Sequence, residues 1–314
     1  KRIFLLMIPR TLGVVGLQIN LFVITSIASG LASGSISIFN FANNLQGLAS
    51  GIVGVSFSMA VFPSLSRAWV NGAKEEFLAR FSSVFRQIVY IIIPLSILIF
   101  ILRNQIVEII LKHGEFSQLS AQLTSTSLGL LSFSIFAFSL IPLLARTFFS
   151  FQDTKTPTVI VVLMMLLNIV LSIYLTSVLA TQNFFQVFLK NVFSLQGIED
   201  VRVVALPLAH SISVIFQFVL LLIFLRRRLG DIALKEIFNS LKKILAASIL
   251  MGGSAYFLLK ILADFVDMQT FLGIFFQTAI TGLVGILVYS LTTFYLKSPE
   301  LESLKFYILS KFRK

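Results

Sequence analysis

The sequence predicts an all-α polytopic membrane protein with about eight transmembrane helices. Of its 314 residues, 57% are hydrophobic and only 12% are charged, and the mean hydropathy is +0.97. These values lie outside the range of soluble globular domains. At roughly 20 residues per span plus connections, a chain of this length accommodates about eight spanning helices. The sequence contains no cysteine, which excludes a disulfide framework and a thiolate metal site.

The apolar runs that define the spans are separated by short polar connections. We expect spans at residues 3–27, 37–62, 87–111, 122–147, 157–180, 205–226, 241–262 and 271–296. Most Lys and Arg residues fall in the connections on one side, whereas the other side has only Arg103, Lys112, Lys190, Arg202 and Lys260. The positive-inside rule therefore predicts that both ends of this chain are cytoplasmic. It also accounts for the net charge of +12, so no nucleic-acid partner is expected.

Two connections are long enough to form structure of their own. Residues 64–86 mix Trp69, Phe77 and Phe81 with charges, which predicts a helix lying in the cytoplasmic interface. Residues 181–200, with Phe184 and Phe188 among several aromatic side chains, predict a similar segment on the outer face. An amphipathic anchor explains both segments more simply than a contact with a substrate.

Small and polar residues recur every three or four positions between residues 35 and 66. The set comprises Asn40, Asn43, Asn44, Gly47, Ser50, Gly51, Gly54 and Ser58. This spacing places them on one stripe of a helix, where amides that faced lipid would lack hydrogen-bond partners. Two interpretations remain open. One is close helix packing through Gly and Ser, and the other is a polar cavity lined by Asn43, Asn44 and Gln46.

Arg10 is the basic residue that lies inside an apolar run. It follows Pro9, about one or two helical turns from the cytoplasmic edge of the first span. Gln18 lies about two turns further along the same face. Either the guanidinium reaches back to the interface, or it faces a cavity and binds an anionic group such as phosphate.

A weaker polar set occurs in the fifth and sixth predicted spans. It comprises Asn168 and Ser172, together with Ser213 and Gln217. Hydrogen bonds between helices explain these residues most simply, and a weak site for a monovalent cation at Asn168, Ser172 and Ser213 is the alternative. His210, near a span entrance, is expected to be an interfacial histidine.

Carboxylates and catalytic groupings are missing from the predicted spans. All thirteen Asp and Glu residues fall outside the apolar centres, and Glu108 comes closest. A proton relay built on buried carboxylates is therefore not expected within this chain. The sequence also lacks a Ser/His/Asp grouping in a suitable context, a HExxH motif and a phosphate-binding Gly loop. We expect neither an enzyme nor a metal site, and no cofactor apart from the cation considered above.

Several segments resemble the second half of the MurJ (MviN) family, which are lipid II flippases of the multidrug/oligosaccharidyl-lipid/polysaccharide exporter superfamily. They are PRTLG at residues 9–13, AVFPSLS at 60–66, KHGEFS at 112–117 and LLARTFFSFQDTKTP at 143–157. The last is the most specific, and its signature residues here are Arg146, Asp153 and Pro157. The matches span most of residues 3–225.

The resemblance implies a bacterial cytoplasmic membrane protein with fourteen helices in two lobes around a cationic cavity. Residues 1–230 would form the second six-helix lobe, and residues 231–314 two further helices with a groove for a polyprenyl tail. The missing N-terminal lobe would then be a partner. That expectation agrees with a chain that begins at Lys1 without an initiator methionine and runs directly into a span.

Two places depart from the family pattern. Many members carry Asp and Arg followed by Glu on the eighth helix, where this sequence has Asn43, Asn44 and Gly47. Some members hold a cation with acidic side chains where this sequence has Asn168 and Ser172. Amides still donate hydrogen bonds to a diphosphate, but the Coulomb attraction of a charge is lost. The resemblance therefore does not carry sodium coupling over to this chain.

The sequence thus predicts a flippase that moves a lipid-linked peptidoglycan precursor across the bilayer by alternating access. We expect the residues that contact its head group to be Arg10, Gln18, Asn43, Asn44 and Gln46. One alternative is an exporter of another lipid-linked oligosaccharide or of a drug cation, although a cation carrier is expected to show intramembrane carboxylates. Another is a scaffold that binds partners through its basic face, and an enzyme acting on polyprenyl lipids comes last.

Overall fold

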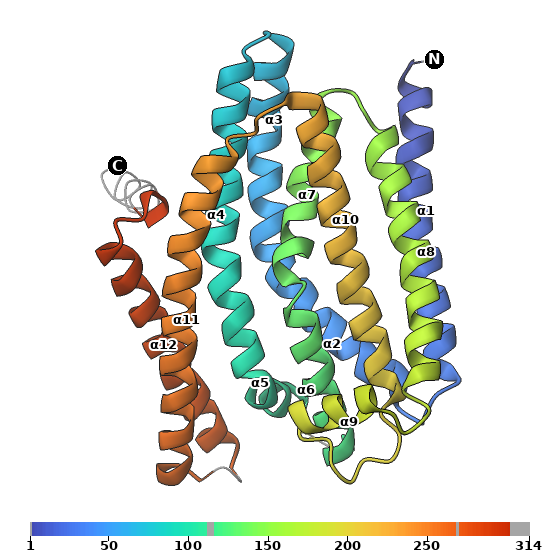
Figure 1. Cartoon of the computed structure of the whole chain (residues 1–314), viewed down its shortest axis with the longest axis vertical. Coiled ribbons are helices and arrows are strands. Elements are labelled where there is room, and N and C mark those ends of the chain that lie inside the picture. The colour runs from blue at the N-terminus through green and yellow to red at the C-terminus, as the bar shows by residue number, and fades with distance from the viewer. Residues whose placement is uncertain (1, 112–115, 268–269, 302–314) are drawn as a thin grey trace.

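The structure is a computed structural model, and the described part of the chain contains helices only (Figure 1). It describes the backbone of residues 2–111, 116–267 and 270–301, and the side chains in these ranges other than those of residues 2–14 and 17. The helices are α1 (Arg2–Ser29), α2 (Ser35–Ser50), η1 (Gly51–Val55), α3 (Ser56–Val70), α4 (Lys74–Ile101), α5 (Arg103–Leu111), α6 (Gln118–Ser132), α7 (Ile135–Ser150), α8 (Lys155–Val178), α9 (Phe184–Val192), η2 (Arg202–Val204), α10 (Ala205–Leu229), α11 (Leu234–Phe265) and α12 (Phe271–Tyr295).

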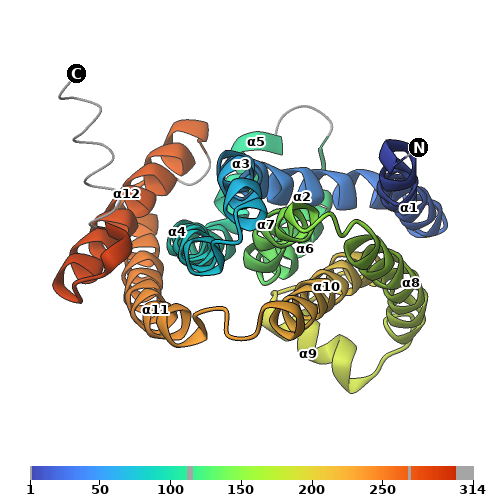
Figure 2. The ribbon, with the colours of Figure 1, turned by 90° about the horizontal axis from the view of Figure 1, so that it is seen from above.

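Each of the eight predicted spans corresponds to helical structure. Among the described residues, six helical units are long and apolar enough to cross a membrane, and the α6–α7 pair, bent by 49°, would supply a seventh. The remaining predicted span is α1, which has 28 residues. In Figure 2, α1 and α8 form one edge of the bundle and α11 and α12 the other, with α4, α7 and α10 between them. The prediction of an all-α polytopic fold is confirmed.

Three of the predicted spans are interrupted helices. The second begins as α2, passes through the π-helix η1, and continues as α3. The third breaks at Leu102, after which α5 turns away from the axis of α4 (Figures 1 and 2). The fourth breaks at Phe133 and Ser134, between α6 and α7. Such interruptions leave backbone groups without a hydrogen-bond partner in their own helix. Side chains from neighbouring helices must then supply that partner.

The prediction of an interfacial helix at residues 64–86 is wrong. These residues form the end of α3 and the start of α4, joined by a turn in which Gly72 has a φ of 70°. Phe77 and Phe81 are fully buried, and Trp69 packs edge-on against Phe77. The aromatic side chains therefore fill the space between helices rather than the lipid interface.

The second connection does contain a short amphipathic helix. α9 buries Gln186 and Leu189 on one face and exposes Phe184 and Phe188 on the other. Its first turn is capped by Asn183, whose side chain accepts a hydrogen bond from the amide of Gln186 at 2.8 Å. The geometry agrees with an amphipathic anchor, and its contact with a membrane stays a prediction.

Helix η1 lies directly against α7. A Cβ atom built on Gly54 would lie 2.7 Å from the Cα atom of Ser139, so only glycine allows this approach. Gly47 and Gly51, on the same helical unit, would meet no atom within 4 Å. Close packing through small residues is therefore confirmed at Gly54 and does not apply to Gly47 or Gly51.

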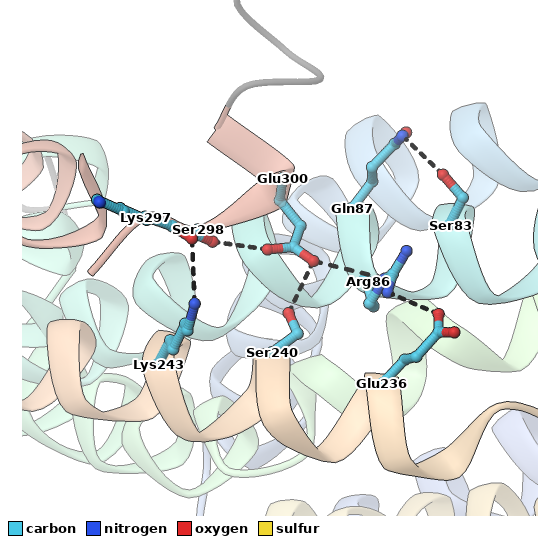
Figure 3. Close-up of polar contacts among 9 residues, drawn as sticks. All are labelled: Ser83, Arg86, Gln87, Glu236, Ser240, Lys243, Lys297, Ser298 and Glu300. Carbon is cyan, nitrogen blue, oxygen red and sulfur yellow. Dashed lines mark hydrogen bonds and ion pairs between the residues drawn. The ribbon is translucent and has the colours of Figure 1, made fainter. Parts of the chain in front are cut away.

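A polar clasp of Arg86, Glu236, Ser240, Ser298 and Glu300 joins the middle of α4 to the start of α11 and to the turn that follows α12 (Figure 3). The buried carboxylate of Glu300 accepts hydrogen bonds from the hydroxyls of Ser240 (2.8 Å) and Ser298 (2.6 Å) and lies 3.5 Å from Nε of Arg86. Arg86 also donates to Glu236 at 3.0 Å. One carboxylate thus connects α4 and α11 to the turn that follows α12. The predicted domain boundary at residue 230 stays a prediction, and these contacts bridge it.

A second polar link joins α4 to α12 closer to the centre of the bundle. Pro94 has no N–H group, so it cannot donate to the carbonyl of Tyr90 one turn earlier. Tyr289 of α12 donates its hydroxyl to that carbonyl at 2.7 Å, and the hydroxyl of Tyr90 lies 3.0 Å from that of Thr293. The carbonyl that Pro94 leaves without a donor in its own helix therefore forms a contact between α4 and α12.

We expect Gly54→Ala to lower the melting temperature of the purified protein, because the added methyl group collides with the backbone of Ser139. Overpacking of this kind costs about 1–3 kcal/mol. Gly51→Ala is the matched control and is expected to leave the melting temperature unchanged or slightly raised, since alanine favours helix. Equal melting temperatures for the two variants, measured by thermal unfolding in detergent, would contradict the close contact.

We expect Glu300→Gln to loosen the docking of α12, because the amide cannot reproduce the charge opposite Arg86 or accept the same set of hydrogen bonds. Weakening such a buried, charge-assisted network costs about 1–3 kcal/mol. Hydrogen exchange of the backbone amides in α12 should accelerate. Glu76→Gln removes an exposed pair with Arg80 on α4 and should leave α12 unaffected. The same exchange rates in both variants would show that the clasp does not hold α12.

Candidate functional site

The first two candidates lie on α1. The side chain of Arg10, like all of those in the PRTLG segment, lies outside the described residues, and so do residues 112–115 of the KHGEFS segment. Gln18 is exposed, next to the exposed side chains of Ile19 and Phe22. The structure thus places Gln18 on an open face of α1, and the role of Arg10 stays a prediction.

The three amides predicted on α2 do not face the same way. Asn44 is exposed and Asn43 is half-buried, whereas Gln46 is completely buried. Residues two positions apart on an α-helix point in directions about 200° apart, so Asn44 and Gln46 lie on opposite sides of α2. The prediction that all three amides line one polar face is wrong for Gln46, whose amide is engaged inside the protein.

Gln46 forms part of a brace with Ser134 and Ser211 that stabilises the break between α6 and α7. Its Nε2 atom donates to the hydroxyl of Ser134 at 3.0 Å and lies 3.4 Å from the carbonyl oxygen of Leu131. Ser211 of α10 donates to the carbonyl of Leu130 at 3.0 Å. The sequence did not predict a role for Ser134 or Ser211, because isolated serines in apolar helices give no sign that a nearby carbonyl needs a hydrogen-bond donor.

Arg146 lies where α7 passes the π-helix. Its Nη1 atom donates to the carbonyl of Val55 at 3.0 Å and to the hydroxyl of Ser58, which is fully buried. A π-helix disturbs the regular ladder of backbone hydrogen bonds, and a guanidinium can satisfy a carbonyl that it leaves free. This residue of the family signature therefore has a structural role in holding α7 against the second span.

The other two signature residues shape the turn between α7 and α8. The carboxylate of Asp153 accepts from the amide and the hydroxyl of Thr156, at 3.0 and 2.8 Å, and so caps the start of α8. Arg228 at the end of α10 donates to the same carboxylate at 2.7 Å. Pro157 is buried in the first turn of α8, where proline is tolerated. The QDTKTP segment thus ties three helices together at one end of the bundle.

The weaker polar set contains a direct bridge between α1 and α8. Nδ2 of Asn168 lies 3.1 Å from Oδ1 of Asn20, and both side chains are buried. Ser172, one turn further along α8, and Ser213 on α10 are completely buried, and no described residue forms a hydrogen bond with either hydroxyl. Asn20 was not among the candidates named from the sequence, although an amide side chain within an apolar run is a sign of a buried polar contact.

These residues offer only neutral oxygen atoms. The described residues contain no group of three His, Asp or Glu side chains that could hold a metal ion. Asn168, Ser172 and Ser213 supply amide and hydroxyl oxygens, which suit a weakly held monovalent cation or a water molecule better than a multivalent ion. The assignment of a weak cation site to these residues stays a prediction.

An apolar groove lies where α4 meets α12. It has a volume of about 590 Å³, and its walls include Tyr90, Pro94 and Leu98 of α4 and Ile286 and Tyr289 of α12. Gly285 permits this close packing, since a Cβ atom there would lie 3.2 Å from Leu98. We call this space the α4–α12 groove. It falls within the region where the resemblance implies a groove for a polyprenyl tail, but α4 rather than α11 forms most of its second wall.

The sequence matches known proteins over most of its length. The model of a family described as lipid II flippase MurJ matches residues 1–276. The probable lipid II flippase MurJ of Buchnera aphidicola subsp. Acyrthosiphon pisum is 28% identical over 239 residues, which make up 70% of this chain and 46% of that protein. The corresponding Vibrio cholerae protein is 32% identical over 167 residues, 53% of this chain and 32% of that protein. The chain therefore spans less than half the length of these relatives.

Solved structures of transporters share the fold. The inward closed conformation of lipid II flippase MurJ aligns with a TM-score of 0.70 at 23% identity, covering 91% of this chain and 52% of that one. An outward-facing multidrug resistance MATE family transporter of the MOP superfamily aligns with a TM-score of 0.53 at 15% identity, covering 96% and 66%. The structural likeness establishes the fold, and the family model covers well over half of the sequence. The chain belongs to the MurJ family of lipid II flippases.

Proposed function

We propose that this chain forms the second lobe and the last two helices of a lipid II flippase in the bacterial cytoplasmic membrane. The observation that carries the proposal is the family match over residues 1–276. The structural neighbour described as lipid II flippase MurJ supports it. The substrate would be a lipid-linked peptidoglycan precursor, and an N-terminal lobe and the bilayer would be the partners.

The arrangement of polar and apolar surfaces suits a lipid-linked substrate. Asn44 and the half-buried Asn43 offer hydrogen bonds from α2, and Gly47 and Gly51 leave the helix surface beside them open. The α4–α12 groove offers an apolar path of the kind that a polyprenyl tail requires. Separate surfaces let the head group cross in a polar cavity while the tail stays in lipid, which avoids moving charges through hydrocarbon.

Alternating access requires helices that can bend, and three interruptions supply candidates. They are η1 in the second span, the Leu102 break before α5, and the break between α6 and α7. Each has a side-chain hydrogen bond to a backbone carbonyl beside it, from Arg146, Arg103 and Gln46 respectively. We propose that these joints allow the lobe to change shape while the backbone groups remain satisfied.

In the complete protein, we expect Arg10→Ala to abolish complementation of a bacterium depleted of its own flippase, since the guanidinium would supply the charge that holds the pyrophosphate. Arg80→Ala is the control: it removes an exposed arginine paired with Glu76 on α4 and should complement normally. Normal growth with Arg10→Ala at normal expression would remove Arg10 from the site.

A flipping assay separates transport from a scaffold role. Purified complete protein reconstituted into vesicles should move labelled lipid II to the opposite leaflet, and Asn44→Leu should slow this movement by about tenfold or more, because a hydrogen bond to a charged group is lost. Leu48→Asn, one turn further along the exposed part of α2, tests whether an additional amide is tolerated. Labelled lipid that stays on its original leaflet with the unaltered protein would favour the scaffold.

A further inference from the structure

A second apolar groove runs along the other side of α4, between α4, α7, α10 and α11. It has a volume of about 700 Å³, and we call it the α10–α11 groove. Each of these helices contributes lining residues, for example Val89 of α4, Phe136 of α7, Leu222 of α10 and Leu241 of α11. Along α4 it extends from Phe85 to Phe100, which is about 22 Å at the helical rise of about 1.5 Å per residue. That length covers most of a hydrocarbon core of about 30 Å.

This groove is separate from the α4–α12 groove. The residues of α4 that line the two spaces form different stripes, with Val89, Ile93 and Ile97 on one and Tyr90, Pro94 and Leu98 on the other. The two sets of lining residues have no member in common. A lipid tail in one groove therefore leaves the other free for a different occupant.

Figure 2 shows the connection where α10 ends and α11 begins. Basic residues lie on both sides of it, with Arg226 near the end of α10 and Lys235 and Lys242 near the start of α11. Lys235 and Lys242 share a face of α11 with the groove residues Phe238 and Leu245, because these four positions follow one another at steps of three and four. Nζ of Lys242 lies 4.6 Å from the centre of the Phe238 ring. Arg226 follows the groove residue Leu222 by one turn of α10.

These three cations have no carboxylate partner among the described residues. Two acids lie close by in the sequence: Glu236 pairs with Arg86, and the exposed Asp231 accepts a hydrogen bond from the amide of Leu234 at 3.3 Å. Arg226, Lys235 and Lys242 are exposed. An excess of positive charge therefore lies at the mouth of an apolar channel, the arrangement that complements a molecule with an anionic head and long hydrocarbon chains.

We propose that the α10–α11 groove binds an anionic glycerophospholipid of the surrounding membrane. Its acyl chains lie along α4 and α10, and its phosphate contacts Arg226, Lys235 and Lys242. The bound lipid bridges α10 and α11 across the predicted domain boundary at residue 230 and adds to the contacts made by the clasp. This inference does not depend on the proposed transport activity.

The first test replaces the three cations together. Purified complete protein is stripped of lipid, titrated with phosphatidylglycerol, and analysed by native mass spectrometry. The combined variant Arg226→Gln, Lys235→Gln and Lys242→Gln should bind phosphatidylglycerol at least about tenfold more weakly, since each cation contributes to the attraction. The control variant Arg67→Gln, Lys74→Gln and Lys155→Gln removes the same charge from exposed positions away from the groove and should bind normally.

The second test fills the groove. Leu245→Trp introduces a bulky ring into the channel, whereas Ile249→Trp places the same ring one turn further along α11, at a position that is 68% exposed and does not line the groove. Only Leu245→Trp should weaken the binding of phosphatidylglycerol. The melting temperature of each variant, measured in parallel, reports whether it is folded.

Three outcomes would overturn the proposal. Equal affinity of the unaltered protein for phosphatidylglycerol and phosphatidylcholine would show that the head group is not recognised. Equal loss of affinity in the groove and control variants would place the lipid elsewhere. Displacement of phosphatidylglycerol from the unaltered protein by an equal concentration of a polyprenyl diphosphate, together with weaker polyprenyl diphosphate binding in Leu245→Trp than in Ile249→Trp, would assign the groove to the transported lipid instead.

Discussion

The fold depends on satisfying the backbone carbonyls that interrupted helices release at membrane depth. Lipid offers no hydrogen-bond donors, so each free carbonyl must find a partner within the protein. Three carbonyls, two at such interruptions and one that Pro94 leaves without its helical donor, receive a donor from another helix. Leu130 receives one from Ser211, Val55 from Arg146, and Tyr90 from Tyr289. The same bonds that repair the backbone therefore also hold helices together.

This arrangement explains how the lobe can contain bends and still be stable. At the break before α7, Gln46 and Ser211 approach from α2 and α10, so three helices meet at one polar brace. At η1, glycine lets the backbone of the second span touch that of α7, and Arg146 binds the carbonyl nearby. Joints of this kind can bend without exposing unpaired backbone groups to lipid, as a transporter that changes shape requires.

Helix α4 joins α11 and α12 to the other described helices. One of its faces lines the α4–α12 groove, and another lines the α10–α11 groove. The clasp around Glu300 holds α4 at Arg86, and the tyrosine pair with α12 holds it one turn further on, at Tyr90. A lipid tail bound in either groove would therefore contact the helix that packs against α11 and α12.

The sequence by itself determined the fold class, the approximate spans and the family, because hydropathy and the QDTKTP signature are local properties of the chain. It could not determine which side chains face each other. Gln46 was expected beside Asn44, yet the helix turns it inward to the α6–α7 break, and the aromatic side chains expected at the membrane interface pack between α3 and α4. Serines and glycines that matter at single contacts, such as Ser211 and Gly54, resemble other small residues until the opposing helix is known. Only the tertiary structure decided these placements, because they depend on contacts between residues that lie far apart along the chain.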